Sequence, residues 1–220
     1  LIIIREFNPD LVISDIMMPE MSGDELCSAI KGDLEMSHIP VVLLTAQGDE
    51  KNMLEGLEIG ADAYITKPFS VGILKATIKN LLANRALLRQ VYNSIEEEEH
   101  NFPVNCTNTL DWKFIASVKE CIEKNMGDPD FNVEMLSSRH HMSRTSFFNK
   151  LKVLTGYAPA DYIRMIRLQH AAQLLKQGEY TIAEITDMVG FSDAKYFREV
   201  FKKYYGVSPS KYGESEKTDP

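Results

Sequence analysis

Residues 190–212 read GFSDAKYFREVFKKYYGVSPSKY and carry the most specific pattern in the chain. Their apolar side chains recur at three- and four-residue steps, which predicts a helix with one buried face formed by Phe197, Val200, Phe201 and Tyr204. Ser192 is a good N-cap for this helix, and Gly206 is expected to end it in the left-handed conformation. Ser208-Pro209 is expected to open a last short helix. The face opposite the apolar one carries Ala194, Lys195, Arg198, Glu199 and Lys202.

The run GFSDxxYFxxxFKKxxGxSPxxY resembles the second helix-turn-helix of the AraC/XylS family of transcription regulators, and the resemblance extends back to about Phe131. It implies an all-α domain with two helix-turn-helix units that bind double-stranded DNA. In the first unit, Asn132 and Ser143 are expected to cap successive helices around a turn at residues 140–142. The predicted DNA contacts are Ser143, Arg144, Thr145, Ser146, Asn149 and Lys150 in the first unit, and Asp193, Ala194, Lys195, Tyr196, Arg198 and Glu199 in the second.

A long helix is predicted over residues 160–177, where apolar side chains are interleaved with Arg164, Arg167 and Lys176. At 1.5 Å per residue its length is on the order of 27 Å, close to the ~34 Å between successive major-groove faces. Thr181 is then expected to cap a short helix, Ile182–Met188. In the AraC/XylS family such a long helix joins the two units, so we expect them to read adjacent turns of one duplex face.

Positive charge is concentrated in the segment that resembles a DNA-binding domain. Residues 131–213 hold 12 Lys and Arg against 7 Asp and Glu, although the whole chain has a formal net charge of −8. Residues 1–91 hold 8 bases against 13 acids, and residues 92–110 hold four glutamates and no base. This distribution favours contact between the basic segment and phosphates, and it indicates an exposed acidic linker at 92–110.

Composition limits the classes of protein that this chain can belong to. With 220 residues, of which 44% are hydrophobic and 25% charged, two ordinary soluble domains are expected. We find no apolar run of membrane-spanning length and no secretory leader, so the prediction is a cytoplasmic chain without membrane contact. Three widely spaced cysteines, Cys27, Cys106 and Cys121, indicate neither a disulfide framework nor a zinc site.

The first part of the chain has the pattern of an α/β fold. Short apolar runs at 11–14, 41–44 and 63–66 are typical of parallel strands buried on both faces, and residues 23–31 and 50–59 have helical spacing. A parallel sheet with helical crossovers is therefore predicted. In such sheets ligands bind beyond the carboxyl ends of the strands. The polar residues at those ends are Asp15, Thr45 and Lys67.

The segments DLVISDIMMPEMSG, VVLLTAQ and GADAYITKPF resemble the receiver domain of two-component response regulators, which has a flavodoxin-like parallel sheet. The resemblance implies that Asp15 accepts a phosphoryl group from a histidine kinase and also contributes to a Mg²⁺ site. By the same resemblance, Thr45 would hydrogen-bond a phosphoryl oxygen, Lys67 would pair with its charge, and Tyr64 would change its burial on activation. Pro68 is expected to follow a cis peptide bond.

The receiver is predicted to be incomplete in this chain. In the family, two strands and a pair of acidic Mg²⁺ ligands precede the segment that resembles residues 1–90. We therefore expect Mg²⁺ in the complete receiver and none bound by this piece. A helical pattern without Pro runs from Ser70 to about residue 91. The predicted domains are a partial receiver at 1–91, an acidic linker at 92–110 and an AraC-type domain at 111–220.

Together these features predict a phosphorylation-controlled, sequence-specific DNA-binding transcription regulator and not an enzyme. Its expected partners are double-stranded DNA, a phosphodonor histidine kinase domain, RNA polymerase and a second copy of the chain in a homodimer. The same domain order occurs at the C-terminal end of membrane-anchored hybrid sensor kinases, so the chain could be the output part of one. An enzyme of flavodoxin-like fold would need a glycine-rich phosphate loop after a strand, and the sequence has none.

A protein-interaction module with a basic helical face is the remaining alternative. It predicts that changes at Lys195 or Arg198 alter the binding of an acidic partner and leave DNA affinity unchanged.

Overall fold

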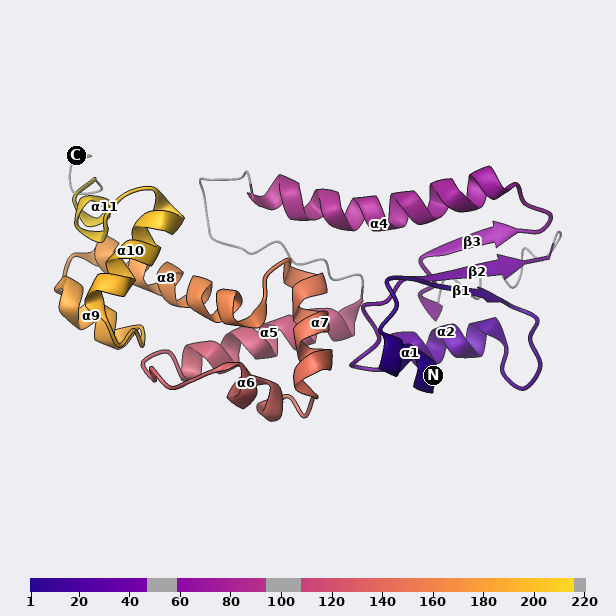
Figure 1. The fold of residues 1–220 in the computed structure, drawn as a ribbon, viewed down its shortest axis with the longest axis horizontal. Coiled ribbons are helices and arrows are strands. Elements are labelled where there is room, and N and C mark those ends of the chain that lie inside the picture. The colour runs from indigo at the N-terminus through magenta and orange to yellow at the C-terminus, as the bar shows by residue number, and fades with distance from the viewer. Residues whose placement is uncertain (47–58, 94–107, 216–220) are drawn as a thin grey trace. The chain divides into compact units, whose positions relative to one another are not determined.

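The computed structural model describes residues 1–46, 59–93 and 108–215, except for the side chains of residues 84–93 and 215 (Figure 1). The chain divides into two compact units. Unit 1 comprises Leu1–Ile115 and Thr145–Gly156, and unit 2 comprises Ala116–Arg144 and Tyr157–Pro220. Most of the helix predicted at residues 50–59 lies outside the described residues. No helix within the described ranges is both long and apolar enough to cross a membrane.

Unit 1 contains a three-stranded parallel sheet in the order β1-β2-β3, built from β1 (Val12–Asp15), β2 (Val41–Thr45) and β3 (Ala63–Thr66). The central strand β2 is the most buried of the three, which follows from its continuous apolar run. Asp15 pairs with Leu44, and Thr45 pairs with Thr66. The carboxyl ends of all three strands therefore meet at one edge, as the sequence predicts.

The helices of the α/β part are α1 (Ile2–Phe7), α2 (Gly23–Gly32) and α4 (Val71–Asn93). A capping box begins α2: the Ser22 hydroxyl accepts from the Glu25 N–H at 3.1 Å, and the Glu25 carboxylate accepts from the Ser22 N–H at 2.8 Å. The core of this part is formed by Ile16, Cys27, Ile30, Met36, Ile39, Val41 and Leu43. Burial of these side chains holds α2 and the following loop against β2.

Two further segments complete unit 1. One is the first part of α5 (Thr109–Lys124), and the other is α7 (Arg144–Thr155). Phe114 of α5 and Phe147 of α7 pack edge to face, with ring centroids 5.7 Å apart. Both side chains are almost fully buried.

Unit 2 is entirely helical in its described residues and contains α6 (Val133–Arg139), α8 (Pro159–Gln177), α9 (Ile182–Met188), α10 (Ala194–Tyr205) and α11 (Pro209–Ser215). α8 packs against α9 and α11, and α10 packs against the same two helices. Asn132 caps α6, and Thr181 caps α9 in a capping box with Glu184. Both caps confirm the sequence predictions.

The N-cap predicted for α10 is wrong by one residue. Asp193, and not Ser192, is the N-cap, because its carboxylate accepts from the Tyr196 N–H at 2.7 Å. At the other end Gly206 has φ 75° and donates its N–H to Lys202 O, which confirms the predicted left-handed cap. The predicted fold class, a parallel α/β part followed by helix-turn-helix units, is thus the one observed.

Candidate functional site

The first candidate site lies at the carboxyl edge of the sheet in unit 1. The Lys67 ammonium forms an ion pair with the Asp15 carboxylate, and both side chains are open to solvent, with 41% and 37% of their surface exposed. The main chain fixes this arrangement, since the Lys67 N–H donates to Thr45 O at 2.7 Å. Asp15 Oδ1 also accepts from the Met17 N–H at 3.3 Å. The three predicted strand-end residues are thus neighbours, and an exposed carboxylate and an ammonium lie in contact.

The electrostatics keep Asp15 ionised. The hydrogen bond from Lys67 is the main cause that lowers the pKa of the Asp15 carboxyl below its ordinary value. The carboxylate is therefore anionic at neutral pH, which is the state that a nucleophile requires. Gly23 makes room for this edge, because a Cβ there would lie 2.3 Å from Asp15 O. The Lys67-Pro68 peptide is cis, as predicted.

Thr45 and Tyr64 complete the predicted phosphoryl site from the two neighbouring strands. Thr45 is 3% exposed, and its hydroxyl donates to Ala46 O at 3.3 Å. Tyr64 is half-buried beside the core, and burial raises its pKa to about 12. Its hydroxyl has no hydrogen-bond partner among the described residues. A change of Tyr64 burial on activation stays a prediction.

The residues at this edge do not make a Mg²⁺ site by themselves. Mg²⁺ is held by several oxygen ligands in near-octahedral geometry. Asp15 supplies one carboxylate, which already pairs with Lys67 and accepts an N–H. Across the described ranges, no group of three or more His, Cys, Asp or Glu side chains could hold a metal ion. Receiver domains generally use Mg²⁺, and Asp15 is the residue at this edge that would contribute to holding it.

The second candidate site is the exposed face of α10. Phe197 and Phe201 are fully buried at a spacing of four residues, so the opposite side of the helix is turned to solvent. Aromatic contacts anchor the buried side, with ring centroids 5.3 Å apart for Phe191 and Phe197 and 5.7 Å apart for Phe197 and Phe201. The exposed side chains on and just before this helix are Asp193, Lys195, Tyr196, Arg198, Glu199 and Lys202, with Ala194 half-buried.

The third candidate site is the corresponding face of α7, where Arg144 and Thr145 are exposed and Ser146 and Asn149 are half-buried. Ser143 precedes the helix and is exposed. The structure contradicts the outward position predicted for Lys150, which has no exposed surface.

A buried ion pair explains the position of Lys150. Its ammonium lies 2.6 Å from Asp111 Oδ1, and the Asp111 side chain is equally inaccessible. Because both charges are removed from water, the pair must be matched by further hydrogen bonds, and Ser37 Oγ accepts from Lys150 Nζ at 2.7 Å. Lys150 therefore does not face a ligand in this conformation.

Sequence reasoning also missed the role of Arg167 on α8. This side chain is only 8% exposed, and it donates to Gly190 O at 2.9 Å and to Asp128 O at 2.5 Å. It ties α8 to the turn between α9 and α10 and to the turn after α5. The signal was present in the spacing, because Arg167 lies four residues from both Ile163 and Ala171 on the buried stripe.

Two known domain families match separate parts of the chain. A response regulator receiver domain matches residues 1–79, and a helix-turn-helix domain matches residues 136–215. The solved C-terminal domain of the two-component response regulator yesN from Fusobacterium nucleatum is 31% identical, with 46% of this chain and 98% of that chain covered and a TM-score of 0.43. The chain thus combines a receiver domain with an AraC-type helix-turn-helix domain.

Two curated relatives match different lengths of this chain. Histidine kinase P4 from Formosa agariphila is 42% identical over 205 residues, which cover 93% of this chain and 15% of that protein. The phosphate regulon transcriptional regulatory protein PhoB from Pseudomonas aeruginosa is 48% identical over 80 residues, which cover 36% of this chain and 35% of that protein. The chain thus spans well under half of the length of either relative.

Proposed function

We propose that this chain is a DNA-binding transcription regulator of a two-component system, which accepts a phosphoryl group on Asp15 and binds double-stranded DNA through exposed side chains of α7 and α10. The observation that carries the proposal is the presence, in one chain, of an ionised strand-end carboxylate beside a lysine and of a basic helix face backed by buried aromatics. The predicted limits, a partial receiver at 1–91, a linker at 92–110 and an AraC-type domain at 111–220, belong to this proposal. The proposed role is regulatory and not catalytic. The proposed location is the cytoplasm.

At the sheet edge, the chain's own residues can supply the acceptor and one counter-charge. Asp15 would attack the phosphorus of a phosphohistidine, so that a P–O bond forms and the P–N bond breaks, with the imidazole as leaving group. Lys67, already in contact with Asp15, would neutralise charge on the transferred group. Thr45 would donate to a phosphoryl oxygen if its hydroxyl turned from Ala46 O.

The phosphoacceptor proposal can be tested with acetyl phosphate, a small acyl phosphate donor. Intact-mass spectrometry is expected to show one added phosphoryl group on the wild-type chain and none on Asp15→Asn. Asp10→Asn is the matched control, because Asp10 is exposed at the other end of β1. A phosphoryl group that remains on the Asp15→Asn chain would place the acceptor elsewhere.

On α10, Lys195 and Arg198 are the bases best placed for DNA. Both are exposed on the face opposite Phe197 and Phe201. A major groove admits an α-helix, and Arg or Lys can contact guanine edges or phosphates there. On α7 the corresponding candidates are Arg144, Thr145, Ser146 and Asn149. Lys150 is not among them in the observed conformation.

Selection of duplexes from a random DNA pool, followed by sequencing, tests the DNA proposal. Two short motifs at a fixed spacing near one helical turn are the expected result. Lys195→Ala should then weaken binding: a loss of about 1–3 kcal/mol confined to one base position indicates base readout, and an equal loss on all sequences with a shallower salt slope indicates a phosphate contact. Lys113→Ala on α5 is the control of equal charge. Binding without any enriched motif would favour the interaction-module alternative.

A second arrangement is favoured by one specific comparison. Because 93% of this chain aligns at 42% identity with a protein named as a histidine kinase, we infer that the chain is the output part of a hybrid sensor kinase. In that case the phosphodonor would be a kinase domain of the same protein. Homodimer formation and contact with RNA polymerase are further parts of the proposal. Light scattering of the chain with and without phosphodonor tests the first of these.

A further inference from the structure

Within unit 1, the buried ammonium of Lys150 binds the loop between α2 and β2. Lys150 Nζ donates to Leu34 O at 2.6 Å and to Ser37 Oγ at 2.7 Å, in addition to its ion pair with Asp111. The Ser37 hydroxyl donates to Asp111 Oδ1 at 2.7 Å, and the Asn108 amide donates to Ser37 O at 3.2 Å. Leu34 and Ser37 lie in the segment that matches the receiver domain. They are therefore hydrogen-bonded to α7, which lies in the segment that matches the helix-turn-helix domain.

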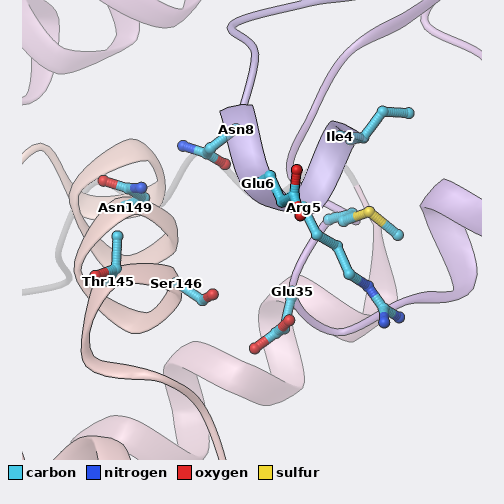
Figure 2. Close-up of a pocket in the computed structure, with 9 residues that line it drawn as sticks. Ile4, Arg5, Glu6, Asn8, Glu35, Thr145, Ser146 and Asn149 are labelled. Atoms are coloured by element: carbon cyan, nitrogen blue, oxygen red, sulfur yellow. The ribbon is translucent and has the colours of Figure 1, made fainter. Parts of the chain in front are cut away.

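Some of the α7 side chains that are proposed to contact DNA face the segment that matches the receiver domain. Thr145, Ser146 and Asn149 of α7 line one wall of a pocket (Figure 2). The opposite wall, which we call the α1–loop surface, consists of Ile4, Arg5, Glu6, Asn8, Glu35 and Met36. Ser146 and Asn149 are half-buried.

The α1–loop surface carries negative charge, as DNA phosphates do, so it can face a helix that is proposed to bind DNA. Glu6 and Glu35 are acidic, and the only base on this wall, Arg5, is paired with Asp33. Carboxylates thus face the hydrogen-bonding side chains of α7 where an anionic duplex would approach. A recognition helix enters a major groove only with its reading face clear. Docking against the α1–loop surface would therefore keep Ser146 and Asn149 from base edges, whereas Thr145 stays exposed.

We propose that the α1–loop surface is an intramolecular docking site for α7 that competes with DNA for the first helix-turn-helix. The inference rests on the proposed DNA binding. Lys150 and Asp111 can stay paired when the surfaces separate, because neither belongs to the α1–loop surface. Separation then breaks the hydrogen bonds from Lys150 to Leu34 O and Ser37 Oγ, the bond from the Ser37 hydroxyl to Asp111, and the bond from Asn108 to Ser37 O. While the docked state predominates, a change that weakens it raises DNA affinity by the same factor.

Hydrogen exchange of the whole chain, with and without the most enriched duplex from the random pool, tests the competition directly. On DNA addition, amides of residues 33–39 are expected to exchange faster while those of α7 exchange more slowly. Slower exchange in α7 with unchanged or slower exchange at 33–39 would overturn the inference and leave DNA binding intact. If no duplex is enriched and α7 gains no protection, the proposed function itself fails, and the competition with it.

Ser37→Ala provides a second test without a change of charge. It removes the two hydrogen bonds of the Ser37 hydroxyl, one from Lys150 and one to Asp111, so operator affinity should rise about fivefold or more, and α7 amides should exchange faster without DNA. Ser28→Ala, on the exposed side of α2, is the matched control and should leave both quantities unchanged. Glu35→Gln should also raise affinity more than the equally charged control Asp10→Asn. Faster α7 exchange in Ser37→Ala without a gain in affinity would contradict the inference.

Discussion

The two candidate recognition helices, α7 and α10, have the same length and the same stripe pattern but different surroundings. Both span 12 residues, and Phe147 of α7 corresponds to Phe197 of α10 in the pattern. Three residues later, α7 has Lys150, which is fully buried, whereas α10 has Val200, which is half-buried. A charged residue at a stripe position therefore joins α7 to a buried polar network, whereas the corresponding position of α10 is apolar.

The largest effect is expected from breaking the network under α7. Lys150→Met would leave the Asp111 carboxylate buried without its counter-charge, so the free energy of unfolding should fall by about 3–5 kcal/mol. Urea denaturation measures this. The double variant Lys150→Met with Asp111→Leu removes both charges and should recover most of the loss. If Lys150→Met alone costs less than about 1 kcal/mol, the pair is not the element that distinguishes α7.

For α10, the turn that precedes the helix is the next test. Gly190 has φ 70°, and a Cβ there would lie 2.3 Å from Met126 O. Gly190→Ala should therefore cost about 3 kcal/mol of unfolding free energy, from backbone strain and overpacking together. Gly206→Ala has a similar φ of 75° but no atom within 4 Å of the new Cβ, so about 1 kcal/mol is expected. Equal losses in the two variants would show that the contact with Met126 is unimportant.

A smaller effect is expected at Arg167, which holds that turn from α8. Arg167→Met would leave Gly190 O and Asp128 O without their donor, at a cost of about 2 kcal/mol in unfolding free energy. Arg164→Met, which removes only an exposed pair with Asp161, should change stability by less than about 0.5 kcal/mol. Thermal unfolding of the two variants side by side decides whether burial or charge is responsible.

The smallest effect concerns the N-cap of α10. Asp193→Ala removes the acceptor for the Tyr196 N–H and should cost about 1 kcal/mol, whereas Ser192→Ala should be nearly neutral. Urea midpoints of the two variants measure the difference. If Ser192→Ala were more destabilising than Asp193→Ala, Ser192 would be the N-cap.

The outward position predicted for Lys150 was wrong, although the helical period indicates a buried position. Residues 147, 150, 151 and 154 follow the i, i+3, i+4, i+7 pattern of a buried stripe, so Lys150 lies on the buried side. Its charge favoured an outward assignment, because lysine is almost never fully buried unless paired. For the same reason, the burial of Arg167 was not predicted. The partner that permits burial is distant in sequence: Asp111 lies 39 residues from Lys150, and Ser37 lies 113 residues away.

The sequence by itself determined the parallel strands, the order of the helices, most caps and the strand-end group of Asp15, Thr45 and Lys67. These features depend on local periodicity, on turn residues and on the rule that parallel strands end at one edge. Only the tertiary structure decided which polar side chains are buried and what covers α7. That outcome depends on pairs such as Lys150 and Asp111, in which a charge can leave water only because a remote partner is brought to it.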